Sequence, residues 1–312
     1  MKVSREISPE IAEKIFLLEE KYAAMGQNLS AYMEGLLQAD YPTYWDYIQL
    51  DVLLNLQHPK TPIPDEKIFI IYHQITELYF KLILLALERI CQEKVLTTSH
   101  FITQLERINS YLDNLIHSFS IMIGGMDKED FLRFRMALLP GSGFQSAQFR
   151  MIEIYSTRLI HLVNENQRPG LNENNPEALL NNIYWRSGAT ELATGKKTLT
   201  LKQFEIKYQD RFLELARSCQ TSNLEVLFEQ FNAEDQALLV PHLRELDRNI
   251  NWRWPLMHYK SAVRYLQQPP EDIAATGGTN WQQFLPPKNK RIIFFPNLWT
   301  AAEKEQWGKS AH

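Results

Sequence analysis

The apolar residues of this chain recur with the 3.6-residue period of an α-helix. Long windows carry an apolar stripe opposite polar residues, and almost none alternate apolar and polar positions as strands do. The pattern therefore predicts an all-α fold, built as a helical bundle. The predicted helices cover residues 9–24, 43–57, 65–92, 98–118, 127–139, 144–164, 175–183, 201–218, 222–231, 235–250 and 255–267.

Two stretches break this helical pattern. Residues 165–198 are rich in Asn, Gly and Thr, which indicates a loop region with one short helix. Residues 268–296 contain the proline pairs at 269–270 and 286–287, which predict a non-helical segment near the C-terminus. Neither stretch resembles a low-complexity linker, and no internal repeat occurs. We therefore expect residues 1–312 to form a single domain.

Composition limits the classes of partner. Hydrophobic residues make up 45% of the 312 positions and aromatic residues 12%, which is ample for a buried core. The formal net charge is −4, and the basic residues are scattered along the chain. Because no overall positive field attracts nucleic acid, we expect no nucleic-acid partner.

The cysteines and the first residues bear on the compartment. Cys91 and Cys219 form neither a disulfide framework nor a Cys-x-x-Cys site, which fits a reducing cytosol. The N-terminal residues lack the apolar core of a signal peptide. A cytoplasmic protein is therefore expected.

The most apolar stretch, residues 68–87, is about as long as a membrane span. It includes His73, Glu77 and Lys81, whose polar groups are costly in lipid. We interpret this stretch as a buried helix of a soluble protein and expect no membrane association.

One segment combines an arginine with a turn of small residues. Phe131 and Arg135 are four residues apart and share a helix face, and the Pro140-Gly141 pair should end that helix. The following turn offers the Ser142 hydroxyl and backbone N–H groups near the guanidinium. This combination is typical of a carboxylate-binding site. A helix-turn-helix with an ordinary surface arginine has the same pattern.

Four segments together resemble the tryptophan 2,3-dioxygenase family, haem enzymes that open the indole ring of L-tryptophan. They are residues 44–51, 69–79, 131–150 and 254–279, and they occur in the family's order. The resemblance implies a helical bundle that encloses a haem, and a C-terminal segment that closes over the site as a lid. It also implies insertion of O2 across the indole C2–C3 bond, which gives N-formylkynurenine and begins tryptophan catabolism through the kynurenine pathway.

The resemblance assigns the haem ligand. The chain has eight histidines, and any one of them is more often a structural residue than a ligand. His258, which follows Trp254 by four positions, matches the family's proximal ligand to the haem iron. No Cys-x-x-Cys-His attachment site occurs, so haem b would be bound without covalent links, with Fe(II) needed for activity.

On the opposite side of the haem, the resemblance gives His73 and Phe69 catalytic roles. His73 would accept a hydrogen bond from the substrate indole N–H, and Phe69 would pack on the ring. A neutral imidazole accepts at only one nitrogen, so a neighbour has to fix its tautomer. Glu77, one helical turn further on, is a candidate for that role. A core histidine bonded to a carbonyl is the alternative.

The amino-acid end of the substrate would be bound by other residues. The resemblance implies that Arg135 grips the carboxylate together with Ser142, and that Thr276 contacts the ammonium and carboxylate groups. Phe131 would line the pocket. Taken without the resemblance, Thr276 belongs to an ordinary glycine-containing turn.

Tyr44 and Tyr47 match aromatic residues that, in the family, come from a neighbouring subunit to complete the pocket. The resemblance therefore implies a homotetramer. Two tyrosines on a helix are otherwise typical of a core.

Some positions depart from the family's common pattern. Pro255 interrupts the run before His258 and should kink or start a helix, and the spacing from His258 to Thr276 is longer than expected. These departures keep two alternatives open. One is a related haem monooxygenase acting on a modified tryptophan or another aromatic amino acid. The other is a non-catalytic helical protein that binds haem or indole.

Overall fold

A computed structural model describes residues 7–138, 143–187, 189–190, 196–267 and 286–309. Every regular element within these ranges is a helix, and the only β-type pairs there are two isolated bridges. The prediction of an all-α fold is confirmed. The chain divides into two compact units, Met1–His58 and Pro59–His312, and each is considered by itself. A single domain over the whole chain stays a prediction.

The described part of the first unit consists of helices, and no residue in any of them is buried. The predicted helix over residues 43–57 is wrong in one respect, because it is two helices. Gln49 separates them in the left-handed backbone region, with φ 53° and ψ 45°. An L-residue in that conformation interrupts a right-handed helix. The helices are α1 (Pro9–Ala24), α2 (Leu29–Leu37), α3 (Tyr44–Tyr47) and α4 (Leu50–Leu54).

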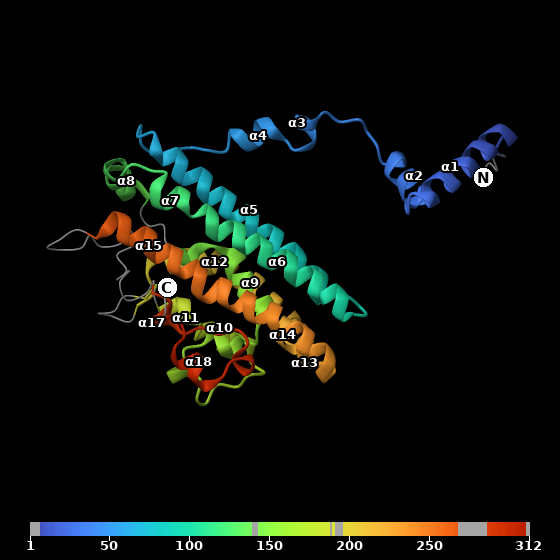
Figure 1. Ribbon diagram of the computed structural model, residues 1–312. Coiled ribbons are helices and arrows are strands. Elements are labelled where there is room, and N and C mark those ends of the chain that lie inside the picture. Colours follow the sequence, from blue (N-terminus) through green and yellow to red (C-terminus); the bar gives the residue numbers. More distant parts are fainter. Residues whose placement is uncertain (1–6, 139–142, 188, 191–195, 268–285, 310–312) are drawn as a thin grey trace. The chain divides into compact units, whose positions relative to one another are not determined.

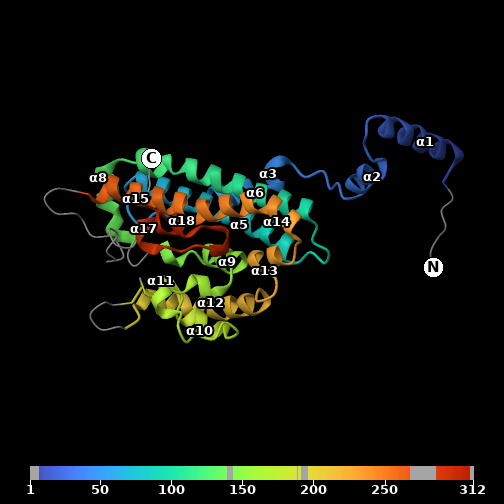
Figure 2. The same ribbon diagram turned by 60° about the horizontal axis from the view of Figure 1, so that its bottom comes forward.

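The second unit is built around three long, adjacent helical segments (Figure 1). Helix α5 (Asp65–Cys91) and helix α6 (Thr98–Ser118) form a hairpin with a short loop. Helix α14 (Ala233–Arg248) packs on the other side of α6. Beyond α5 lies α9 (Ala147–Ser156), and α12 (Leu199–Ser218) packs against α9, as Figure 2 shows. The order of neighbours is therefore α14, α6, α5, α9 and α12.

Shorter elements connect and cover these helices. They are α7 (Ser120–Gly124), α8 (Lys128–Phe134), η1 (Arg135–Leu138), η2 (Gly143–Gln145), η3 (Leu159–Leu162), η4 (Glu165–Gln167), α10 (Pro176–Asn181), α11 (Tyr184–Ser187), α13 (Leu224–Glu229), α17 (Pro287–Lys290), η6 (Pro296–Leu298) and α18 (Ala301–Glu305).

Helix α5 is buried on one side only. Tyr72, Phe80 and Leu87 are among the residues of its buried face. Its other face exposes a stripe of apolar side chains, so the expectation of a buried helix holds for one face only. By length and composition α5 is the one described helix that could cross a membrane, a property that core helices of soluble proteins share. The exposed stripe is Ile71, Leu78, Leu82 and Leu85.

Helix α14 continues without a break into α15 (Trp254–Leu266) through the π-helix η5 (Asn249–Arg253). Two separate helices had been predicted here. Pro255 is the second residue of α15 and directly follows the π-helical turn, so its missing N–H removes one backbone hydrogen bond at the point where the winding of the continuous helix changes. Asn249, fully buried in η5, donates from Nδ2 to Oδ1 of Asn109 on α6, 3.3 Å away. Helix α6 thus holds the junction that leads to His258.

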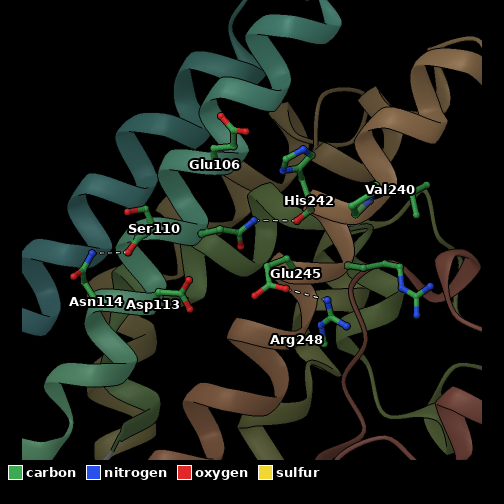
Figure 3. Close-up of a pocket in the computed structure, with 11 residues that line it drawn as sticks. Glu106, Ser110, Asp113, Asn114, Val240, His242, Glu245 and Arg248 are labelled. Atoms are coloured by element: carbon green, nitrogen blue, oxygen red, sulfur yellow. Dashed lines mark hydrogen bonds and ion pairs between the residues drawn. The ribbon is translucent and has the colours of Figure 1, made fainter.

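A groove with a volume of about 830 Å³ lies between α6 and α14 (Figure 3). Most of its lining residues are of polar or charged types, among them Glu106, Asp113, His242 and Glu245. None of the site residues predicted from the sequence lines this groove. It is therefore separate from the site described below.

Residues 286–309 are held against the body of the unit by contacts with α14. Asp247, fully buried on α14, accepts hydrogen bonds from the backbone N–H groups of Phe294 and Phe295 and from Nε1 of Trp299. Burial raises the pKa of this carboxyl, and these donors oppose the rise. The predicted non-helical segment, residues 268–296, is wrong in one respect, because it contains the short helix α17. Residues 268–285 lie outside the described residues, so the role of the segment as a lid stays a prediction.

Candidate active site

The predicted site residues are distributed over both units. Tyr44 and Tyr47 lie on α3 of the first unit, where both side chains are exposed. Ser142 and Thr276 lie outside the described residues. The remaining five are on helices of the second unit: Phe69, His73, Phe131, Arg135 and His258.

The helices that carry these residues meet at one end of the bundle, where the start of α5 lies beside α7, α8 and α15 (Figure 1). The ring of Phe69 lies 4.1 Å from that of His73 and 6.4 Å from that of Phe131, measured between centroids. Phe131 in turn lies 4.5 Å from Tyr265 on α15. An aromatic cluster therefore joins α5 to the helix that bears His258.

The imidazole of His73 has a defined tautomer. Its Nδ1 lies 2.7 Å from the backbone carbonyl oxygen of Phe69. A carbonyl only accepts, so Nδ1 carries the proton and Nε2 keeps a lone pair. The expectation that Glu77 fixes the tautomer is replaced by this backbone contact.

The protein around His73 also favours the neutral form of the ring. Removal of water by surrounding atoms lowers the pKa of the imidazole, while the Phe69 carbonyl and the Glu77 carboxylate act in the opposite direction. The side chain nevertheless remains accessible in the isolated chain. A neutral, reachable Nε2 is a hydrogen-bond acceptor at neutral pH.

His258 and His73 are linked through two buried aromatic rings. The His258 ring lies 4.9 Å from Phe119, Phe119 lies 5.6 Å from Tyr72, and Tyr72 lies 6.1 Å from His73. Trp254, one turn before His258, contacts it at 5.1 Å. The two histidines come from different helices and belong to one continuous aromatic region.

Arg135 begins the short 3-10 helix that follows α8. The side chain of Asp127 caps α8 by accepting from the backbone N–H groups of Glu129 and Asp130. This cap fixes the start of the helix that presents Phe131 and then Arg135. Arg135 is 7% exposed, and burial lowers the pKa of its guanidinium. A guanidinium with little water around it binds a carboxylate more strongly than an exposed one does.

Comparison with known proteins identifies the family. The sequence profile described as Tryptophan 2,3-dioxygenase matches residues 34–214, which is more than half of the chain. The chain belongs to the tryptophan 2,3-dioxygenase family. The matched range contains Tyr44, His73 and Arg135, and it ends before His258 and Thr276.

Curated relatives carry the same name. The chain is 40% identical over 119 residues to the tryptophan 2,3-dioxygenase of Ruegeria sp. strain TM1040, covering 37% of this chain and 41% of the relative. It is 43% identical over 121 residues to that of Bdellovibrio bacteriovorus, covering 35% of this chain and 33% of the relative. It is 36% identical over 136 residues to that of Bacillus anthracis, covering 41% of this chain and 47% of the relative. Each match spans less than half of the relative's length.

The donor set fits a haem better than a bare iron ion. Non-haem iron sites need several His, Asp or Glu ligands together, and the described residues contain no group of three such side chains that could hold a metal. A haem needs one axial imidazole in apolar surroundings. His258, flanked by Phe119 and Trp254, offers that arrangement.

The sequence did not indicate Tyr72, Phe119 or Tyr265 as parts of the site. Tyr265 follows His258 by seven residues, two helical turns, so the same-face spacing was a usable signal. Phe119 carried no such signal, because it lies at the junction between α6 and α7 and approaches His258 only in the folded chain.

Proposed function

We propose that this chain is a haem-dependent dioxygenase that inserts both atoms of O2 across the indole C2–C3 bond of L-tryptophan to give N-formylkynurenine. The observation that carries the proposal is the state of His73. Its Nδ1 is committed to the Phe69 carbonyl, so Nε2 is left to accept the indole N–H beside an aromatic wall.

His258 would hold the iron of a non-covalent haem b from α15. When bound, the ferrous haem supplies the activation of O2 that amino-acid side chains cannot provide. Trp254 and Phe119 contact each other and the His258 ring, and this packing limits the orientations of the imidazole. The protein therefore contributes position and polarity at this side of the site.

On the substrate side, each residue binds a different part of L-tryptophan. His73 accepts from the indole N–H, and Phe69 and Phe131 pack against the ring. Arg135 binds the carboxylate, aided by Ser142 and Thr276. These contacts hold the substrate in one orientation, so the reacting groups are already close together when the reaction begins.

The function is tested by turnover under air. Ferrous, haem-loaded protein with L-tryptophan is expected to release N-formylkynurenine, followed by its absorbance and by mass, with both added oxygen atoms labelled when the gas is ¹⁸O2. A product that carries one labelled oxygen would instead identify a monooxygenase. Haem-loaded protein that binds L-tryptophan and releases no product would identify a binding protein.

We also propose that the protein is a homotetramer in the cytoplasm and that Tyr44 and Tyr47 complete the pocket of a neighbouring subunit. The support is exposed apolar surface. The two tyrosines are 71% and 78% exposed, no residue of α1 to α4 is buried, and α5 bears the stripe that begins at Ile71. Burial of such surface favours association in water. Neither a nucleic acid nor a membrane is expected as a partner.

Assembly is expected to be needed for activity. Sedimentation should give a tetramer, and Tyr44→Ser should lower kcat/KM for L-tryptophan about 10-fold, since an aromatic contact beside the substrate is lost. Tyr32→Ser, a second exposed tyrosine in the first unit, should change it little. A fully active monomer in sedimentation would disprove the shared pocket.

A further inference from the structure

The helix that carries His258 contains one turn with a different winding. In the π-helix η5 (Asn249–Arg253), the backbone carbonyl oxygen of Asn249 accepts from the N–H of Trp254, five residues later. An α-helix pairs residues four apart, so this turn holds about one residue more than an α-helical turn. Each residue of an α-helix advances the chain by about 100° around the axis. The direction in which His258 faces, relative to α14, therefore depends on the winding of η5.

Pro255 gives the change of winding a local cause. In an α-helix a proline ring clashes with the carbonyl group four residues earlier, which here belongs to Asn251. A wider turn lessens that clash, which agrees with a π-helical turn directly before the proline. The side-chain contacts that hold the turn come from another helix.

Helix α6 contacts both ends of the π-helical turn. At the first end, Nδ2 of Asn249 donates to Oδ1 of Asn109, and both side chains are buried. At the last end, Nη1 of Arg253 donates to Oδ1 of Asp113 at 2.6 Å. Asn109 and Asp113 are four residues apart on α6, and the two residues that they bind are also four residues apart. Helix α6 thus holds the first and the last residue of η5.

The two ends of the turn are also joined to each other. Nη1 of Arg253 donates to Oδ1 of Asn249 at 2.6 Å, so the Asn249 amide binds Arg253 through its oxygen and Asn109 through its nitrogen. Asn249 is fully buried, and removal of its amide would leave a buried partner without its hydrogen bond. We call the four residues of this network the α6 clasp: Asn109, Asp113, Asn249 and Arg253.

The helix continues from the clasp to His258 without a break. Trp254 directly follows η5 and is buried. Its ring lies 4.8 Å from that of Phe119 and 5.1 Å from that of His258, measured between centroids. A rotation of α15 about its axis would move both Trp254 and His258 out of these contacts.

We propose that the residues of the α6 clasp are positioning residues, which hold η5 in its π-helical winding and so fix the direction in which α15 presents the His258 imidazole to the haem iron. This inference rests on the proposed function, in which His258 is the proximal ligand. The clasp acts through the backbone of the continuous helix.

The first test removes the buried amide with Asn249→Ala. In the ferrous, haem-loaded protein the iron–imidazole stretching band of the resonance Raman spectrum should shift or divide. Haem should also pass to excess apomyoglobin about 10-fold faster than it does from the wild type. Asn114→Ala, an exposed change on α6 at a side chain that donates to its own helix, is the matched control and should change neither result. A wild-type band and transfer rate in Asn249→Ala would overturn the proposal.

A deletion tests whether rotation is the cause. Without the clasp the turn should relax toward α-helical winding, which rotates α15 by about 100°. Trp252 is a half-buried residue of the turn that contacts Trp307 and lies outside the clasp. Its deletion in Asn249→Ala removes the additional residue and turns α15 back, so most of the wild-type band and transfer rate should return. A side chain that only stabilised the fold would give a further loss instead, and that result would contradict the proposal.

Hydrogen exchange separates the clasp from the proposed function. The Trp254 amide, which donates to the Asn249 carbonyl, should exchange faster in Asn249→Ala than in the wild type and the control, while circular dichroism shows that all three are folded. Equal exchange would overturn the clasp itself. If the wild type shows no iron–imidazole band and Trp254 exchanges as expected, the proposed ligand fails together with its positioning, and the clasp around η5 remains.

Discussion

His258→Ala is expected to yield protein that purifies with less than about a tenth of the wild-type haem, while His73→Ala keeps most of it. The axial imidazole supplies the one bond from protein to iron, and its loss leaves only apolar packing to hold the group. His73 would face the substrate and would not bind the iron. His258→Ala should also abolish turnover. His73→Ala should only lower turnover, because the indole is then less well oriented.

Haem content is measured by absorbance after extraction, relative to protein mass, and helical content by circular dichroism. His242→Ala serves as the matched control, because its side chain lines the groove between α6 and α14 and not the site. Removing the His258 ring leaves a space beside Phe119 and Trp254, so unfolding has to be excluded by the helical signal. Equal haem content in His258→Ala and wild type would refute the ligand assignment.

The amphipathic pattern predicted the long helices well, because each buries one apolar stripe against a neighbour. It was less accurate where a local backbone conformation intervened. Gln49, whose backbone is in the left-handed region, divides a stretch whose side chains have the pattern of one helix. At Arg135 the α-helix tightens into a 3-10 helix, which shares the sequence pattern of an α-helical end. The periodicity of apolar residues indicates which helix faces are apolar. It does not indicate where a helix is interrupted or where an α-helix becomes a 3-10 helix.

The parts of the site that depend on one helix were predictable from spacing. Phe69 and His73 are four residues apart on α5 and do contact each other. The contacts between helices were not predictable in this way. Phe119 reaches His258, and Gln148 reaches Glu77, only because α6, α9 and α15 pack around α5. The roles of Ser142 and Thr276 stay predictions, since both lie outside the described residues.

The prediction about the His73 tautomer shows the same limit. In the sequence, Glu77 is the charged residue nearest to His73. In the folded helix the carbonyl of Phe69, also one turn away, meets Nδ1 directly. Every residue has the same backbone carbonyl, so the order of side chains does not indicate which carbonyl will accept a hydrogen bond from a ring nitrogen.

Arg135→Ala is expected to lower kcat/KM for L-tryptophan about 30- to 1000-fold, which corresponds to about 2–4 kcal/mol of lost transition-state stabilisation. Arg135 is nearly buried, so its attraction for a carboxylate is weakly screened by water. Without it the substrate carboxylate would enter the site with no charged partner. Arg135→Lys should restore only part of the activity, because an ammonium group cannot reproduce the planar fork.

A direct contact is distinguished from general damage by a substrate without the carboxylate. Tryptamine should be a poor substrate of the wild type, and Arg135→Ala should leave its turnover nearly unchanged, since the lost partner is absent from the molecule. Haem content should stay at the wild-type level, because Arg135 lies on the element after α8 and His258 on α15. If Arg135→Ala lowers turnover of tryptamine and L-tryptophan by the same factor, Arg135 supports the fold and does not bind the carboxylate.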